Sequence, residues 1–106
     1  DCVFITLVLH PNDQPTIQKI IQEAKRIIDD DGIIVITDYD KKLHLKGRAV
    51  GLFIKTIESC ANQSHRTNYF SFMNHGGLET ILKKQGYQIK ESYHFYHGGL
   101  KTCVIS

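Results

Sequence analysis

The sequence predicts one α/β domain, built on an open and mostly parallel sheet that finishes in an antiparallel hairpin. Two apolar segments, 2–9 and 33–37, flank an amphipathic helical segment, which is the pattern of a strand–helix–strand unit with parallel strands. Near the end of the chain, an alternating segment is followed by a glycine turn and another strand. The 106 residues, 42% apolar and 23% charged, suit a single globular domain over 1–106.

Composition excludes several classes of function. Thirteen Lys and Arg against eleven Asp and Glu leave a net charge of +2, which makes nucleic acid an unlikely partner. No apolar stretch reaches the roughly 18 residues of a membrane helix, and the first residues do not resemble a signal peptide. The three cysteines have no C-x-x-C spacing, so we expect reduced, mostly buried thiols. These features predict a cytoplasmic protein with no membrane contact.

The first predicted strand, 2–9, is apolar on both alternating faces, as expected for a strand inside a parallel sheet. A strand of this kind at a sheet edge would present a hydrophobic row of unpaired backbone groups, which natural proteins avoid. We therefore expect a further strand, from outside residues 1–106, to pair with the strand 2–9. Upstream polypeptide or another chain would supply it.

A helix is predicted at about 14–29, because isoleucines and Ala24 recur at helical spacing after a turn that contains Asp13 and Pro15. Gly32 then turns the chain into the second strand, 33–37, which ends at the acidic turn 38–40. The polar segment 41–47 is predicted to be a loop.

The second half of the chain has weaker patterns. We expect a helix from Arg48 to about 61, a loop over 61–74, and a short helix over 76–85 that closes at Gly86. Residues 87–96 alternate as a half-exposed strand, 97–99 form a turn, and 100–106 return as an antiparallel strand. The predicted order is β-α-β-α-α-β-β.

The order and spacing of these segments resemble the second half of class I S-adenosylmethionine-dependent methyltransferases. The LVLH segment at 7–10 is similar to the "LHH"-like end of the family's fourth strand, and DGIIVITD at 31–38 is similar to its fifth strand. QGY at 85–87 is similar to the family's "aGF", ahead of its terminal hairpin. The resemblance implies a Rossmann-like sheet, in which this chain supplies strands four to seven and the first half of the domain lies outside it.

The resemblance also implies a function and a set of site residues. The chain would supply the acceptor-side half of a domain that transfers a methyl group from S-adenosylmethionine, as in ubiquinone or other small-molecule methyltransferases. Its cofactor-binding residues would be Leu7, Val8, Leu9 and His10. Its substrate-binding residues would be Tyr39, His44, Tyr69, Phe72 and His75.

His10 and Asp38 are the candidate catalytic residues, because each follows a buried strand at the end that faces a ligand crevice in open α/β sheets. Alternatively, His10 caps the turn before Pro11, and Asp38 is a solvated turn carboxylate. We expect no metal site: His94, His97 and Cys103 lie near the final hairpin, but surface placement explains both histidines.

One departure from the family keeps a second function open. The Gly-rich loop that holds the cofactor in these enzymes has no counterpart here, since the sequence contains no G-x-G stretch. The alternative is a non-catalytic binding or scaffolding module that has the methyltransferase-like fold but has lost cofactor binding.

Overall fold

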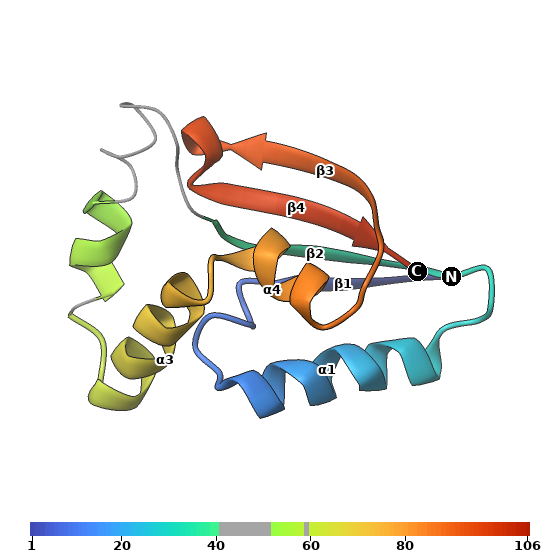
Figure 1. The fold of residues 1–106 in the computed structure, drawn as a ribbon, viewed down its shortest axis with the longest axis horizontal. Coiled ribbons are helices and arrows are strands. Elements are labelled where there is room, and N and C mark those ends of the chain that lie inside the picture. Colours follow the sequence, from blue (N-terminus) through green and yellow to red (C-terminus); the bar gives the residue numbers. More distant parts are fainter. Residues whose placement is uncertain (41–51, 59) are drawn as a thin grey trace.

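A computed structural model describes residues 1–40, 52–58 and 60–106, and it has the α/β architecture that the sequence predicts (Figure 1). The strands are β1 (Cys2–Thr6), β2 (Ile33–Tyr39), β3 (Ile89–Phe95) and β4 (Leu100–Ile105). The helices are α1 (Gln14–Ile27), α3 (Gln63–Asn74) and α4 (Leu78–Lys84), with a further helical stretch at 52–58 and a 3-10 turn, η1 (Tyr96–Gly98). No helix among the described residues is long and apolar enough to cross a membrane.

The four strands form one mixed sheet in the order β1-β2-β4-β3. β1 and β2 pair in parallel through the α1 crossover, which confirms the predicted strand–helix–strand unit. β4 pairs antiparallel with both β2 and β3, so the last strand of the chain lies inside the sheet. The carboxyl ends of β1 and β2 therefore lie at the same edge of the sheet.

β1 is shorter than the predicted strand 2–9 and ends at Thr6. Leu7 has a φ of 55°, a left-handed conformation that costs energy for a residue with a side chain. Its N–H still donates to the Thr37 carbonyl at 2.8 Å, after which the chain leaves the sheet. Leu9 then enters the core and is fully buried. The prediction failed because a continuous run of apolar residues does not show where a strand ends.

α1 forms where the helical spacing predicts it, although it ends two residues earlier. The Asp13 side chain caps its first turn by accepting from the Thr16 N–H at 2.9 Å. The buried residues Ile17, Ile21 and Ala24 face the sheet, because they recur on one side of the helix. The predicted helix over 76–85 is α4, and Gly86 follows it with a φ of 86°.

α3 occupies most of the segment 61–74 that the sequence predicts to be a loop, so that prediction is wrong. The Asn62 side chain begins the helix by accepting from the His65 N–H at 2.9 Å. Only Tyr69 and Phe72 in this helix are buried, so its apolar periodicity is weak. The helix is stabilised by tertiary contacts, among them the Asn68 side chain, which donates to the Pro11 carbonyl at 2.8 Å.

The predicted helix from Arg48 to about 61 falls partly outside the described residues. Within them, 52–58 is helical. Leu52, Phe53 and Ile57 are more than half exposed, so few apolar contacts among the described residues hold this helix in place. The predicted turn 97–99 overlaps the 3-10 turn, and the strand that follows ends at Ile105.

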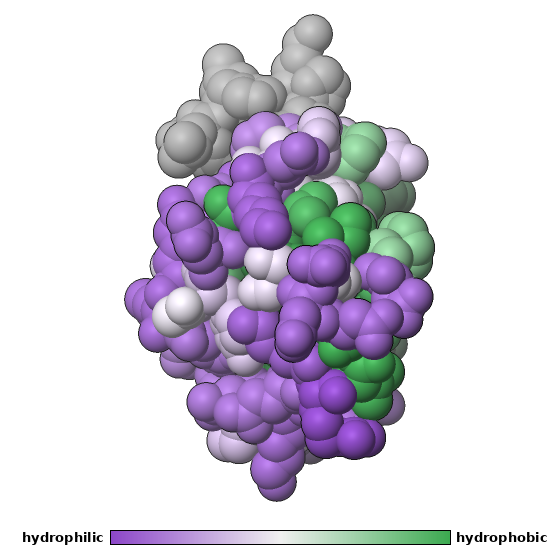
Figure 2. Space-filling model, turned by 90° about the vertical axis from the view of Figure 1, so that its right-hand side faces the viewer, coloured by the Kyte–Doolittle hydropathy of each residue, from purple (hydrophilic) through white to green (hydrophobic). Residues whose placement is uncertain are grey.

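The described helices cover one face of the sheet. The core on that side joins α1 and α4 to alternate residues of the central strands, such as Ile34, Ile36 and Ile105. On the opposite face, Phe4 is paired in register with Val35 and is 72% exposed. Hydrophobic residues also gather along one side of the view in Figure 2, whereas the rest of that view is mostly hydrophilic. No described helix covers this face of the sheet, on which Phe4 lies exposed.

The expectation of mostly buried thiols is wrong for two of the three cysteines, because Cys2 and Cys60 are exposed. Cys103 is fully buried, and this burial raises its pKa to about 11. Since the thiolate is the reactive form, Cys103 is expected to resist alkylation at pH 8. Titration with a thiol-reactive dye should give two fast thiols per chain and a third only after urea is added. Three fast thiols in the native protein would contradict the packing of β4.

Candidate functional site

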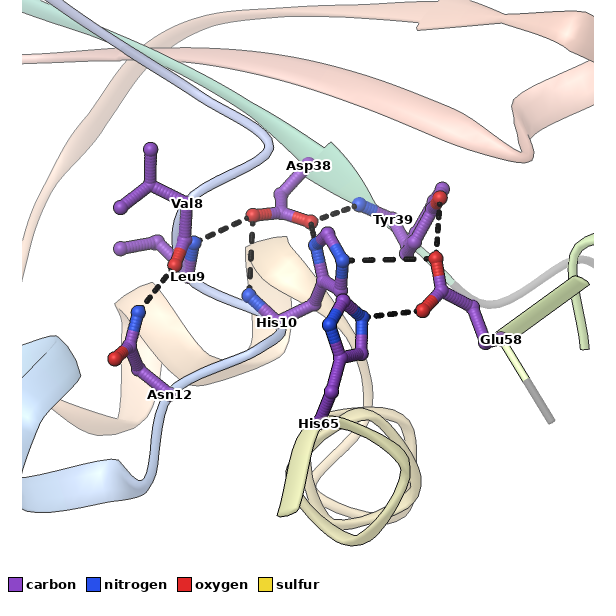
Figure 3. Close-up of polar contacts among 8 residues, drawn as sticks. All are labelled: Val8, Leu9, His10, Asn12, Asp38, Tyr39, Glu58 and His65. Atoms are coloured by element: carbon purple, nitrogen blue, oxygen red, sulfur yellow. Dashed lines mark hydrogen bonds and ion pairs between the residues drawn. The ribbon is translucent and has the colours of Figure 1, made fainter. Parts of the chain in front are cut away.

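The candidate site lies where the parallel strands β1 and β2 end. His10 follows β1 after a short turn, and Asp38 is the penultimate residue of β2. Figure 3 shows His10 between Asp38 on one side and Glu58 on the other, with His65 of α3 beside it. His10, Asp38 and Glu58 are all buried. Four elements therefore bring two histidines and two carboxylates together: the turn after β1, β2, helix 52–58 and α3.

Asp38 accepts four hydrogen bonds. Its Oδ2 accepts from the backbone N–H groups of Leu9 at 2.9 Å and His10 at 3.2 Å. Its Oδ1 accepts from the Tyr39 backbone N–H at 2.8 Å and lies 2.8 Å from His10 Nδ1. Asp38 thus fastens the turn after β1 to the end of β2. The alternative of a solvated turn carboxylate is wrong, because Asp38 is fully buried within the strand.

The contacts of Asp38 assign the tautomer of His10. Three of its four partners are backbone N–H groups, which can only donate, so its oxygens act as acceptors. We therefore assign the proton on His10 to Nδ1, which donates to Asp38 Oδ1. The other ring nitrogen, Nε2, points away from Asp38, and in the neutral ring it carries the lone pair. This is the arrangement in which a carboxylate orients a histidine base.

Glu58 closes the site on the side of His10 Nε2. Its Oε1 atom lies 3.6 Å from that nitrogen. The same oxygen accepts from the Tyr39 hydroxyl at 2.9 Å, and the Oε2 atom forms an ion pair with His65 Nε2. Burial raises the pKa of Tyr39 well above its usual value, and the hydrogen bond to Glu58 adds to this effect. Tyr39 therefore stays protonated at neutral pH and acts as a donor to Glu58.

Two tyrosines form an aromatic wall around His10. The centroid of the Tyr39 ring lies 4.5 Å from that of His10, and the Tyr69 ring lies edge-on at 6.3 Å. Tyr69 also meets Tyr39 edge-to-face at 5.7 Å, a favourable aromatic arrangement. Burial, followed by the charge of Glu58, raises the pKa of Tyr69. Of the five substrate-binding candidates, these two lie beside the group of His10, Asp38, Glu58 and His65, which we call the His10 cluster.

The other substrate-binding candidates lie elsewhere. Phe72 is fully buried within the hydrophobic core. His75 is exposed at the end of α3, with its Nδ1 atom 2.7 Å from the Ser71 carbonyl. His44 lies outside the described residues.

The cofactor-binding candidates form the turn between β1 and His10. Leu7 and Val8 are 42% and 41% exposed, so their side chains are accessible. The side chain of Leu9 is buried, and its N–H is bonded to Asp38. Asn12 donates to the Val8 carbonyl at 2.6 Å and fixes the turn from the other side. The turn thus presents two apolar side chains, those of Leu7 and Val8, beside the His10 cluster.

Sequence reasoning missed Glu58 and His65. Glu58 falls on the polar side of the helix predicted from Arg48 to about 61, and His65 falls in the loop predicted over 61–74. An N-cap signal at Asn62 could have revealed the helix that carries His65, because Asn is favoured at that position. No local pattern could have revealed that both side chains approach His10, since this depends on how the helices pack.

The fold of the chain is similar to that of a solved methyltransferase. The chain superposes on the crystal structure of the methyltransferase CalO6 with a TM-score of 0.62 and 12% sequence identity. The match covers 100% of this chain and 35% of the CalO6 chain. The chain therefore shares the fold of part of a methyltransferase and spans about a third of that protein's length. No family model matches the sequence, and no curated protein matches it.

Proposed function

We propose that the chain is the acceptor-side half of a class I methyltransferase domain, which transfers a methyl group from S-adenosylmethionine to a small-molecule acceptor. One observation carries this proposal: a buried histidine, oriented by a buried aspartate, at the carboxyl ends of two parallel strands. Ligands bind at this edge of open α/β sheets. The likeness of the fold to part of CalO6 supports the same class of reaction.

The turn 7–10 is the part of the chain that fits the cofactor. Leu7 and Val8 offer accessible apolar surface at the edge of the sheet, next to His10. The strained backbone of Leu7 turns this segment out of the sheet, and strain of this kind is common at ligand sites. When bound there, S-adenosylmethionine would supply an activated methyl group. The residues of this chain would align the acceptor and exclude water.

His10 would act as the base for an acceptor that must lose a proton, such as a phenol. Its Nε2 lone pair is available because the proton sits on Nδ1, opposite Asp38. Tyr39 and Tyr69 would pack against an aromatic acceptor. Glu58 stands beside Nε2 in this structure, so the acceptor would enter by displacing its carboxylate. The exposed apolar residues of helix 52–58 support this, because a weakly packed helix can move at low cost.

Further polypeptide would complete the domain. β1 stands at one end of the sheet, and no strand among the described residues pairs with its outer edge. Its alternate residues Cys2, Phe4 and Thr6 are exposed on a face of the sheet that no described helix covers, whereas parallel strands are usually covered on both faces. We propose that upstream polypeptide or another chain pairs with β1 and covers this face. That additional part would also have to supply the rest of the cofactor site.

Calorimetric titration with S-adenosylmethionine tests the proposal. The protein from the complete reading frame is expected to bind the cofactor, and residues 1–106 alone are expected to bind it much more weakly. Absence of measurable heat with the complete protein, checked at two temperatures, would contradict methyl transfer. That result would favour the alternative, a binding or scaffolding module without the cofactor.

A further inference from the structure

We propose that His10, Glu58 and His65 form a binding site for a divalent transition-metal ion, with Zn²⁺ as the best match. One ligand atom from each residue lies within 4.8 Å of the other two. The residues come from three different elements: the turn after β1, helix 52–58 and the first turn of α3 (Figure 3). The proposal does not depend on methyl transfer, and the sequence alone gave no indication of it.

His10 presents a lone pair to the centre of this cluster. Its Nδ1–H is bound to Asp38, so Nε2 faces the Glu58 carboxylate at 3.6 Å. In the neutral ring Nε2 and the carboxylate oxygen are both acceptors, and a cation between or beside them would stabilise the pair. Histidines that bind metals usually donate their other ring N–H to a carboxylate in this way, which fixes the ring and makes it a better ligand.

His65 supplies the second nitrogen. Its position is set by the start of α3, where its backbone N–H donates to the Asn62 side chain. Its Nε2 atom is buried and forms an ion pair with Glu58 Oε2, although the geometry does not satisfy a hydrogen bond. A metal ion bound between these two groups would take the place of this ion pair.

Glu58 supplies the carboxylate, and its surroundings are those of a metal ligand. The Tyr39 hydroxyl donates to Oε1, which orients the carboxylate from outside the cluster. Metal binding requires both histidines to be neutral, and the charges of Asp38 and Glu58 would then sum to −2 in a buried setting. A divalent ion would neutralise these charges, and buried charges need such compensation.

The ligand set selects the kind of ion. Two imidazole nitrogens and one carboxylate suit Zn²⁺ and neighbouring transition metals, whereas Mg²⁺ and Ca²⁺ prefer oxygen ligands. Bonds of about 2.0–2.1 Å in a tetrahedral site place ligand atoms about 3.3 Å apart. The observed 3.6 Å between His10 Nε2 and Glu58 Oε1 is close to this value. Three protein ligands leave a fourth position for water or a substrate atom.

Metal binding and base catalysis would exclude each other, because both use the Nε2 lone pair of His10. Zn²⁺ at the cluster would therefore inhibit methyl transfer if His10 is the base. This consequence rests on the proposed function, whereas the metal site itself does not.

Titration of the metal-free protein with Co²⁺ tests the site, because Co²⁺ bound to nitrogen ligands absorbs visible light. We expect one Co²⁺ per chain, an absorption band at saturation, and loss of that band when Zn²⁺ displaces Co²⁺. Glu58→Gln and His65→Ala should each weaken Co²⁺ binding by about 100-fold or more, because loss of even an outer-shell partner of a metal ligand costs about 10–100-fold. The exposed His94 on β3 gives the matched control, so His94→Ala should leave the affinity unchanged.

Several outcomes would overturn the proposal. One is that no band appears at stoichiometric Co²⁺. Another is that His94→Ala weakens binding as much as His65→Ala. Circular dichroism of each variant separates a lost ligand from a lost fold, and His65→Gln provides a more conservative change if His65→Ala does not fold. Binding of S-adenosylmethionine by the metal-free protein is measured separately, so failure of one proposal does not decide the other.

Discussion

Replacing His10 with alanine is expected to lower the rate of methyl transfer by about 10²–10⁴-fold, the usual contribution of a general base. The reason is the geometry at its ring, where Asp38 holds Nδ1 at 2.8 Å and leaves the Nε2 lone pair for the acceptor proton. The measurement is the formation of S-adenosylhomocysteine by the protein from the complete reading frame, with a panel of small phenols as acceptors.

The affinity for S-adenosylmethionine separates a base from a structural residue. If His10 acts on the acceptor, His10→Ala should lower the turnover rate and change the dissociation constant of the cofactor by less than about threefold. The exposed His94 again provides the control, because His94→Ala should preserve both quantities. A His10→Ala variant that retains most of its turnover rate would show that His10 does not remove the acceptor proton.

Replacing Asp38 with alanine is expected to lower the free energy of unfolding by about 3–5 kcal/mol, the range seen when one partner of a buried charged network is removed. The change removes the acceptor of four N–H donors that point at its oxygens: the backbone N–H groups of Leu9, His10 and Tyr39, and the His10 ring. Small domains are stable by only about 5–15 kcal/mol in total, so the effect is a large fraction of the stability.

Urea unfolding followed by circular dichroism measures this loss. Asp30→Ala is the matched control, because Asp30 is an exposed carboxylate in the turn after α1 and its removal should change stability by less than about 0.5 kcal/mol. A loss of less than about 1 kcal/mol for Asp38→Ala would mean that the turn after β1 does not depend on these hydrogen bonds.

The elements with strong local signals could be predicted from the sequence. α1 has a regular apolar stripe and an Asp13 cap, and β2 contains the predicted apolar run 33–37, although the strand continues through Asp38 to Tyr39 instead of ending at a turn. The βαβ unit follows from these two elements, because a helix between two such strands requires a parallel crossover. The terminal antiparallel pair follows from the alternation of β3 and the glycines of the turn.

Features set by tertiary packing could not be predicted in this way. α3 has only Tyr69 and Phe72 buried, too few to give a helical period. The end of β1 depends on the conformation of Leu7, which its apolar side chain does not reveal. At the site, His10 and Asp38 could be found because each follows a strand. Glu58 and His65 approach them only through the packing of two later helices.

The central claim, that residues 7–10 and the His10 cluster form the acceptor side of a methyltransferase site, is tested most directly by hydrogen–deuterium exchange. The protein from the complete reading frame would be compared with and without S-adenosylmethionine, and its peptides over 7–10 and 38–39 would be followed. We predict that the cofactor slows exchange in these peptides and leaves those of the exposed strand β3 unchanged. Binding of the cofactor with no change in exchange at 7–10 would contradict the claim.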